Sequence, residues 1–364
     1  MVNNDLFYQI ALMQIFGIGP VTAKKLFLHF GSAKAVFEAE LTDLQIYGLN
    51  KELAQMIKSG KTFKFAEDEL NFIEKYGIRT FLFNQKEYPV RLKNFDESPF
   101  LLYFKGETNL NASKIVAIVG TRKPTDYGLQ HCEKIVQDLK SYNVLVISGL
   151  ALGIDGCAHQ KCIENEIDTV GIVAHGLDRI YPHSHKKLAQ HMVRSGVGLL
   201  TEFPSGTEPV QGNFPARNRI IAGLCDALIV VETAMSGGSM ITANMANHYH
   251  KDVFAIPGRI GDAYSEGANQ LIKTHRASLL TTVEDIAYHL RWERKQNAVQ
   301  KKLFLALSLE EQSVTNLLVG KDSVHLNHLI QESGLSTSRL ASVLLEMEMK
   351  ALIRALPGKY FKMA

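Results

Sequence analysis

A glycine, a hydroxyl residue and a cation follow the first apolar run in the central part of the chain. Gly120, Thr121 and Arg122 come directly after Ile115–Val119 and before a predicted helix. A glycine lets a backbone approach a phosphate closely, and an arginine can hold that phosphate through two parallel hydrogen bonds. The spacing is neither the dinucleotide fingerprint GxGxxG nor the P-loop GxxxxGK[ST]. The loop therefore predicts an anion-binding site of another kind.

A second loop after an apolar run extends from Ser148 to Asp155 and is rich in small residues. Ser148, Gly149 and Gly153 suit a nest of backbone amides that binds an anion. Asp155 and His159 stand four residues apart and could form a catalytic or metal-binding pair. We favour the alternative, in which Asp155 faces the dipole at a helix start and His159 packs nearby.

Two lysines occupy a comparable position beneath a third strand end. Lys186 and Lys187 lie near a predicted helix start, where phosphate groups bind readily. The neighbouring His183 and His185 form an HxH pair, and residues 248 and 250 form another. Histidines in such pairs more often face solvent than bind metal, so we predict no metal site.

The fourth cluster opens a predicted helix over residues 215–224. Its members are an aromatic ring, two arginines and the asparagine between them: Phe214, Arg217, Asn218 and Arg219. Glu202 and Glu232 at strand ends are available to pair with the arginines, so we expect one arginine to be structural and the other to face phosphate. Small residues suited to the same pocket follow at Ser236, Gly237, Gly238, Ser239 and Thr242.

These loops together offer cations, hydroxyl groups and an aromatic ring, but no nucleophile beside a base and no pair of carboxylates. We therefore predict no catalytic residue, no cofactor and no metal. Cations that track a backbone, together with rings that stack on bases, bind single-stranded nucleic acid without sequence preference. A single strand is the ligand that this combination favours.

The elements that must position these loops lie in a central block, residues 77–290. Short apolar runs recur at 115–119, 144–147, 170–174, 198–200, 227–231 and 253–256, with helical segments between them. Such runs indicate parallel strands buried on both faces. We predict an α/β fold with a doubly wound, mostly parallel, Rossmann-like sheet. Ligands of such sheets bind outside the carboxyl ends of the strands.

The block before it, residues 1–75, predicts a helical domain of the helix-hairpin-helix or SAM-like kind. Residues 16–20 form its hairpin. Lys24 and Lys25 in the following helix could help the hairpin amides to bind a DNA phosphate. The block holds 8 Lys+Arg and 9 Asp+Glu. Because it has no basic excess, we slightly favour the alternative of a small helical bundle that does not bind DNA.

The last block, residues 297–364, predicts a winged helix from helices at 325–332 and 336–350 and a terminal hairpin. Many winged helices bind DNA through the third helix. Here that helix carries Glu346 and Glu348 with few basic residues, whereas phosphate binding needs Lys and Arg. We favour a protein-contact or structural role.

The composition of the chain restricts the classes of protein to which it can belong. The chain has 364 residues, 46% apolar and 21% charged, which excludes a disordered chain, a collagen-like repeat and a long coiled coil. We find no signal-peptide pattern and no long apolar run, and the four cysteines lack zinc-ligand spacing. We expect a cytoplasmic protein with reduced thiols and no membrane contact. The net charge of +3 is small, so nucleic-acid binding must depend on local clusters.

Several ordered motifs resemble the DNA-processing protein A (DprA/Smf) family. They span most of residues 80–290 and read IVAIVGTRKPTDYG, VISGLALGIDGCAH, TVGIVAHGLDRIYPHSHKKLA, TEFPSGTEP, NFPARNRIIAGL, SGGSMITANMA and VFAIPG. The resemblance implies a non-enzymatic protein of natural transformation that binds and protects incoming single-stranded DNA, loads RecA recombinase and self-associates into a dimer or higher oligomer. It adds Asn269 of GANQLI to the DNA-binding residues. Leu152 departs from the arginine that relatives commonly carry.

A Rossmann-fold nucleotide phosphoribohydrolase is the main alternative. Such enzymes carry a PGGxGTxxE segment with a catalytic Glu, and residues 237–243 lack that Glu. A nicotinamide oxidoreductase is disfavoured because the glycine fingerprint and its acidic ribose ligand are missing.

Overall fold

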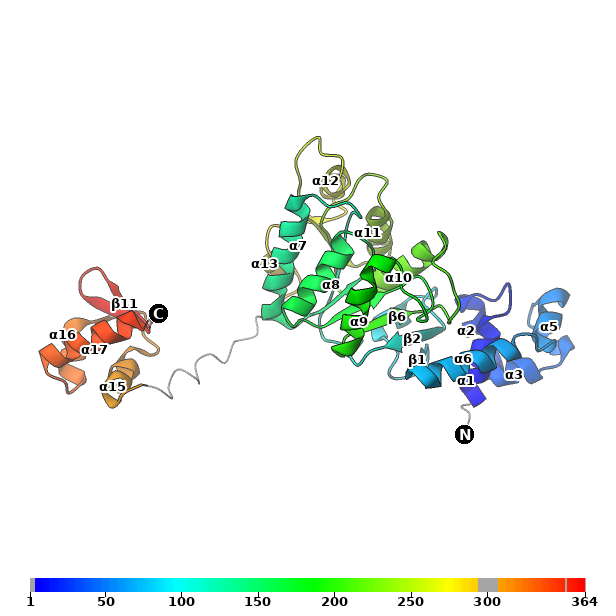
Figure 1. Ribbon diagram of the computed structural model, residues 1–364, viewed down its shortest axis with the longest axis horizontal. Coiled ribbons are helices and arrows are strands. Elements are labelled where there is room, and N and C mark those ends of the chain that lie inside the picture. Colours follow the sequence, from blue (N-terminus) through cyan, green and yellow to red (C-terminus); the bar gives the residue numbers. More distant parts are fainter. Residues whose placement is uncertain (1–3, 294–306, 351, 364) are drawn as a thin grey trace. The chain divides into compact units, whose positions relative to one another are not determined.

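The computed structural model describes residues 4–293, 307–350 and 352–363. The chain forms two compact units, residues 1–294 and 295–364. In the first unit, helices cover both faces of a nine-stranded sheet, and six helices precede the first strand (Figure 1).

The strands of this sheet are β1 (Arg79–Leu82), β2 (Leu101–Lys105), β3 (Ile115–Val119), β4 (Leu145–Ser148), β5 (Thr169–Ile172), β6 (Gly198–Thr201), β7 (Ala227–Val230), β8 (Asp252–Ala255) and β9 (Ser278–Leu279). The helices before the sheet are α1 (Asn4–Met13), α2 (Pro20–Phe30), α3 (Ala33–Glu38), α4 (Leu41–Ile46), α5 (Lys51–Lys58) and α6 (Phe63–Tyr76). Those between and after its strands are α7 (Asp126–Leu139), α8 (Ile154–Glu164), α9 (Lys186–Arg194), α10 (Asn213–Leu224), α11 (Gly238–His248), α12 (Glu266–Lys273) and α13 (Val283–His289). Single 3-10 turns are η1 (Val90–Asn94), η2 (Lys140–Tyr142) and η3 (His183–His185).

The strand order is β1-β2-β6-β5-β4-β3-β7-β8-β9. Strands β3 to β9 run parallel to one another, as predicted for β3 to β8, and β1 and β2 are antiparallel additions at one edge. From β3 the chain winds outward through β4 to β6, then returns to β7 on the other side of β3. The topological switch point therefore lies between β3 and β7, which is where such sheets bind ligands.

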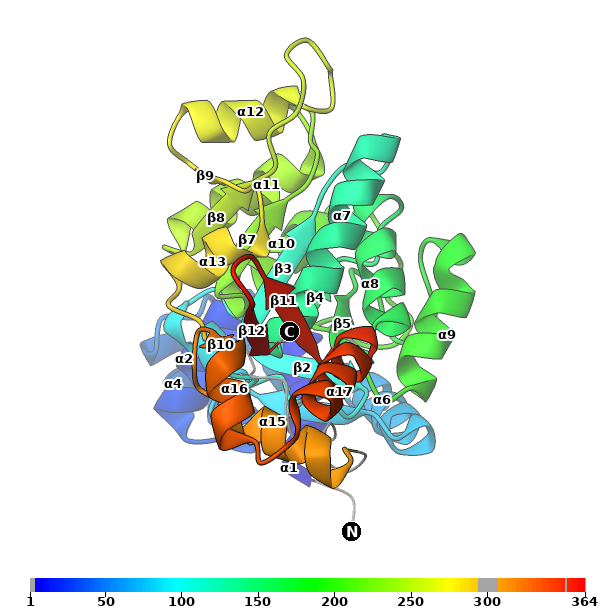
Figure 2. The same cartoon turned by 90° about the vertical axis from the view of Figure 1, so that its left-hand side faces the viewer.

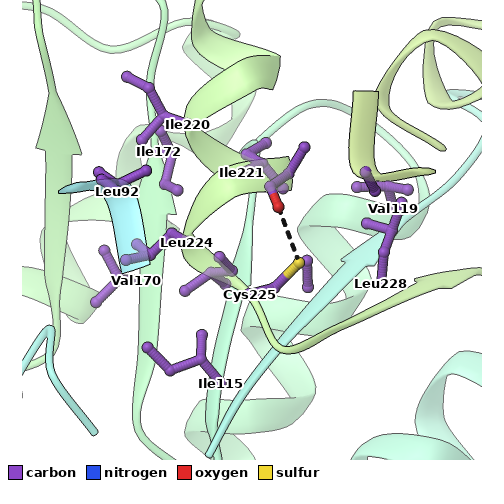
Figure 3. Close-up of a cluster of buried hydrophobic side chains, with 14 of the residues drawn as sticks. Leu92, Ile115, Val119, Val170, Ile172, Ile220, Ile221, Leu224, Cys225 and Leu228 are labelled. Atoms are coloured by element: carbon purple, nitrogen blue, oxygen red, sulfur yellow. Dashed lines mark hydrogen bonds between the residues drawn. The ribbon is translucent and has the colours of Figure 1, made fainter. Parts of the chain in front are cut away.

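The unbroken apolar run of β3 is explained by burial on both faces. Ile115, Ala117 and Val119 face a core that α10 and α11 cover, whereas Val116 and Ile118 face a second core under α7, α8 and α13. Figure 3 shows side chains of α10 packed against residues of β3, β5 and β7 in the first of these cores.

Strand β2 links the sheet to the helices that precede it. Leu102 and Phe104 belong to the sheet core, whereas Leu101 and Tyr103 pack with the cluster that α1, α2 and α3 build. One hydrophobic cluster therefore includes residues on both sides of the predicted boundary near residue 76, within the compact unit 1–294. Strands β1, β2 and β9 were not predicted, because each is short or lies beside mixed apolar sequence.

The second unit is a winged helix, as predicted. It contains α15 (Leu309–Leu318), β10 (Val324–His325), α16 (Leu326–Glu332), α17 (Thr337–Met349), β11 (Ile353–Leu356) and β12 (Tyr360–Met363), with strand order β10-β12-β11 (Figure 2). The Ser336 hydroxyl accepts a hydrogen bond from the Arg339 amide at 3.4 Å and so caps α17. Strand β10 was not predicted.

All four cysteines are free, three of them buried. Within the described residues, no helix combines the length and apolarity that a bilayer crossing requires.

Falling pH is expected to destabilise the first unit through His159. Its Nδ1 lies 2.7 Å from the Thr169 hydroxyl, and burial lowers its pKa from 6.5 to about 3. Below pH 6.5 the unfolded chain binds a proton that the folded chain does not, so the free energy of unfolding falls by up to ~1.4 kcal/mol per pH unit until His159 itself titrates.

We expect His159→Gln to lack this part of the pH dependence in urea unfolding between about pH 7 and pH 5. The exposed His248 gives the control variant, His248→Gln, which should retain the wild-type slope. Equal slopes in all three proteins would contradict the assignment.

Candidate nucleic-acid interface

A cavity of about 700 Å³ opens at the switch point of the sheet. We call it the strand-end pocket. Its walls are the loops after β3 and β7 and the first turns of α10 and α11. Predicted residues that line it are Gly120, Thr121, Arg122, Phe214, Arg217, Asn218, Gly237, Gly238, Ser239 and Thr242.

The loop after β3 is held in place by Glu232, a buried residue just beyond β7. The Thr121 amide donates to the Glu232 carbonyl at 2.7 Å. The Thr125 amide and hydroxyl donate to the two carboxylate oxygens of Glu232 at 2.9 and 2.5 Å. Thr125 is also the N-cap of α7. One carboxylate therefore joins the ends of β3 and β7 and fixes the loop that carries Arg122.

Arg122 lies against an aromatic wall of the pocket. Its guanidinium carbon is 5.4 Å from the ring centroid of Phe214, and the Tyr181 ring lies 5.9 Å from Phe214. Within the described part of the chain Arg122 makes no salt bridge, and it is exposed, whereas Phe214 is half-buried. A cation over a ring, both at the wall of a pocket, offers one partner to a phosphate and the other to a base.

Arg217, by contrast, is buried beneath the pocket. It is 4% exposed, and its Nη1 donates to the Ile172 carbonyl at 3.1 Å. Burial lowers the pKa of Arg217 to about 10, opposed by the nearby Asp155 carboxylate, so the guanidinium stays charged at neutral pH. Its Nε has no partner in the described structure. Arg217 therefore adds positive charge beneath the floor of the pocket, and its side chain is not exposed for direct contact with a ligand.

Asp155 balances that charge and shapes the loop after β4. Its Oδ2 accepts hydrogen bonds from the Gly149 and Ala151 amides at 3.1 and 3.4 Å. A Cβ on residue 149 would lie 1.5 Å from Arg217 Nη1 and 2.6 Å from Asp155 Oδ2. Only glycine lets both charged groups occupy this space. Asp155 thus has a structural role, as we favoured. Its hydrogen bonds, however, come from amides of the loop before α8.

Gly153 brings the loops after β3 and β4 together. Its φ of +78° is a left-handed conformation, and a Cβ there would lie 2.3 Å from the Thr121 carbonyl oxygen. The next amide, of Ile154, donates to that same oxygen at 3.2 Å. Gly153 is therefore a close-approach position beside the pocket and not one of its lining residues.

The start of α11 forms the opposite wall. The Ser239 hydroxyl donates to the Thr233 hydroxyl at 2.9 Å, and the Thr242 hydroxyl donates to the Gly238 carbonyl at 3.4 Å. Ser236 is exposed and lies just outside the lining. The small residues leave the first amides of this 11-residue helix uncovered.

Three predicted residues lie away from the pocket for clear physical reasons. Ser148 is fully buried, and its hydroxyl donates to the Ile118 carbonyl at 2.5 Å. The Asn269 side chain makes two 3.0 Å hydrogen bonds with Gly258 and closes a loop. Arg219 points to the other side of α10, where it forms a salt bridge with Glu202. Of the two arginines, the one that lines the pocket is thus Arg217.

The predicted lysines also lie outside the strand-end pocket. Lys186 and Lys187 are exposed at the start of α9. Lys24 donates to the Asp96 carbonyl at 3.1 Å and the Ser98 hydroxyl at 2.5 Å, and burial lowers its pKa to about 8. Its role in the fold is to join α2 to the segment before β2. Lys25 is exposed on α2.

Three residues that line the strand-end pocket were not predicted: Gln211, Ile241 and Tyr264. The Tyr181 ring, which lies 5.9 Å from the Phe214 ring, was not predicted either. Tyr181 stands in the same loop as Lys186, so its ring was available as a second stacking candidate. Within the described residues, no three His, Cys, Asp or Glu side chains are grouped in a way that could hold a metal ion.

The fold and this site define a class: a Rossmann-like binding protein whose pocket presents arginine, backbone amides and an aromatic ring at the strand ends. Two family descriptions match the sequence. "DNA recombination-mediator protein A" matches residues 79–291, and "DprA winged helix domain" matches residues 305–359.

The chain belongs to the DprA/Smf family. It is 32% identical to Protein Smf of Escherichia coli over 331 residues, which cover 88% of this chain and 86% of that protein. It is 40% identical to the DNA processing protein DprA of Streptococcus pneumoniae over 199 residues, 55% of this chain and 70% of that one.

Two solved structures extend the comparison. The crystal structure of S. pneumoniae DprA superposes with a TM-score of 0.68 at 32% identity and covers 79% of this chain and 98% of that one. DNA processing protein A of Helicobacter pylori, whose structure is described for its single-stranded DNA binding mode, superposes with a TM-score of 0.54 at 29% identity and covers 59% of this chain and 97% of that one.

Loss of the Glu232 carboxylate is expected to loosen the loop that carries Arg122. Glu232→Ala leaves the Thr125 amide and hydroxyl without their acceptors, which costs about 1–3 kcal/mol in the free energy of unfolding. Urea titration gives that value, and hydrogen exchange should show faster exchange at the Thr125 amide. The exposed Glu74 supplies the control, Glu74→Ala, which should change neither. Unchanged exchange at Thr125 in Glu232→Ala would contradict the role of this carboxylate.

Proposed function

We propose that this protein binds single-stranded DNA in the strand-end pocket. The observation that carries the proposal is the Arg122 guanidinium lying over the Phe214 ring, 5.4 Å from its centroid, at the switch point of the sheet. A strand supplies the two partners that this arrangement lacks, a phosphate for Arg122 and a base for the ring. The H. pylori relative with a described single-stranded DNA binding mode supports it.

Single strands suit the pocket better than duplex DNA. A base can stack on Phe214 only when it is free of its own stack, which a duplex does not allow without unpairing. The volume of about 700 Å³ lies within the ordinary range of ligand pockets and has room for more than a phosphate. The uncovered amides at the start of α11 add uncharged donors on the opposite wall.

The larger biological role follows from the family. We propose that the protein acts in the cytoplasm, protects incoming single-stranded DNA during natural transformation and loads RecA recombinase onto it. The family description as a recombination mediator supports this role, and all four cysteines are free thiols. We also propose self-association on the strand. When several copies of the protein bind one strand, their weak sites act together. The combined affinity is then higher than that of a single chain of net charge +3.

We propose a protein-contact or structural role for the winged helix. Two cations of its α17 region are already paired with acidic residues of α15: Arg339 with Glu310 at 2.6 Å and Lys350 with Glu311 at 2.7 Å. Cations engaged in this way are poor candidates for phosphate binding by the third helix.

Replacement of Arg122 tests the proposed site. If Arg122 binds a phosphate, Arg122→Ala weakens binding of single-stranded oligonucleotides of every sequence. It also lowers the slope of log affinity against log salt concentration by about 0.7, the value for one phosphate contact on a single strand. Fluorescence anisotropy titrations at several salt concentrations measure both effects.

The neighbouring Lys123 is exposed and does not line the pocket, so Lys123→Ala is the matched control. It should leave the slope at the wild-type value. An unchanged slope in Arg122→Ala, or an equal loss in both variants, would contradict the assignment.

A further inference from the structure

Two cysteine thiols meet between helices α7 and α8, outside the strand-end pocket. Cys132 lies on α7 and Cys157 on α8, and both pack in the core that these helices cover. Neither residue lines the pocket. Cys132 is fully buried, whereas Cys157 is half-buried. The pair therefore has one member that is shielded from solvent and one that a small solute can reach.

Two contacts between the helices show that Cys157 lies on the face of α8 that meets α7. The Cys132 Sγ lies 3.9 Å from the Ile154 carbonyl oxygen. Further along the same helices, Lys161 Nζ pairs with Glu133 Oε1 at 3.0 Å. Residues 154, 157 and 161 have the spacing i, i+3 and i+7, so they share one face of a helix. The side chain of Cys157 therefore lies between the two contacts, beside the Cys132 thiol.

The two thiols also contact each other directly. The Cys132 thiol donates a hydrogen bond to the Cys157 sulfur, which raises the pKa of Cys132 and lowers the pKa of Cys157. Partial burial opposes the lower pKa of Cys157, and the Lys161 ammonium reinforces it. The carboxylates of Glu133 and Glu164 oppose it in smaller measure. Because oxidation of a cysteine follows its thiolate character and its exposure, Cys157 is the more reactive of the two.

The other two cysteines do not suit the same chemistry. Cys162 is fully buried, and burial raises the pKa of its thiol. It follows Cys157 by five residues on the same helix, which turns its side chain about 140° away. Cys225 is fully buried in the other core of the sheet, where its thiol donates to the Ala222 carbonyl at 3.5 Å. A reactive thiol with a second thiol beside it is therefore found at Cys157 and Cys132.

We propose that Cys157 and Cys132 form a reversible dithiol switch that hydrogen peroxide oxidises to a disulfide between α8 and α7. Cytosolic disulfides are usually transient and redox-sensing, so the resting form is the dithiol that the structure shows. An exposed, low-pKa cysteine next to a second cysteine is the usual arrangement of such a sensor.

The oxidation has two steps. The Cys157 thiolate attacks one oxygen of the peroxide, the O–O bond breaks, and the leaving hydroxide takes up the proton that the thiol had lost, which gives water and a sulfenic acid. The Cys132 thiol then attacks the Cys157 sulfur, the S–O bond breaks, and the hydroxyl group leaves with the Cys132 proton as a second water. Two thiols are thereby oxidised and one peroxide is reduced. A thiol reductant restores both cysteines by exchange.

The disulfide joins the two helices that start beside the strand-end pocket. Helix α7 follows the loop that carries Arg122, and α8 begins directly after Gly153. A cross-link between residues 132 and 157 closes a loop in the unfolded chain and lowers its entropy. We therefore expect oxidation to stabilise the first unit against urea. This inference does not depend on DNA binding.

The test uses the full chain, fully reduced and then treated with hydrogen peroxide at neutral pH. Titration of free thiols in denaturant should fall from four to two per chain, and a thiol reductant should restore all four. After the remaining thiols are alkylated, mapping of non-reduced peptides should find the peptides of Cys132 and Cys157 joined. The oxidised protein should also unfold at a higher urea concentration than the reduced protein.

Two variants separate the roles of the thiols. Cys132→Ser keeps the reactive thiol, so peroxide should leave a sulfenic acid on Cys157 that dimedone labels, with no joined peptides. Cys157→Ser, at the half-buried position, should keep its three thiols under the same treatment. Cys225→Ala is the matched control, because it removes a thiol from the other core and should still lose two thiols to the disulfide. Four free thiols in the treated wild type, or a disulfide that joins any other cysteines, would overturn the inference.

Discussion

Two buried carboxylates, Asp155 and Glu232, hold the backbone amides of the loops that surround the strand-end pocket. Each sits near a strand end and accepts hydrogen bonds from a neighbouring loop, Asp155 from the loop after β4 and Glu232 from the loop after β3. Buried carboxylates are costly unless hydrogen bonds or opposite charges compensate them. The loop amides provide that compensation for both, and Arg217 also does so for Asp155. The pocket and the position of Arg122 depend on this arrangement.

Charge in this protein is therefore organised locally. A total of +3 over 364 residues gives no general attraction for DNA. The strand-end pocket instead combines one exposed arginine with one buried arginine and with amides at a helix start. Under the proposed function, this arrangement would let a chain of balanced composition bind a polyanion at one place. Self-association along a strand would then multiply a modest single-site affinity.

The sequence predicted the sheet well because parallel strands buried on both faces leave an unmistakable apolar run, as in β3. It could not show how residues 1–75 pack on the sheet, since strand β2, which was not predicted, alternates its side chains between two cores. In a helix, residues two positions apart lie on nearly opposite faces, so the side chains of Arg217 and Arg219 on α10 point in different directions. Which face lies toward the pocket depends on how the helix packs on the sheet. Likewise, the hydroxyl of Ser148 and the amide of Asn269 look suited to a ligand until their internal partners are seen.

The central claim is that the strand-end pocket takes a single strand. Competition titration of the full chain with single-stranded and double-stranded oligonucleotides of equal length and sequence tests it most directly. Because Phe214 needs an unstacked base, the account predicts tighter binding of the single strand at every salt concentration. Equal affinity for the two forms, or a preference for the duplex, would contradict it.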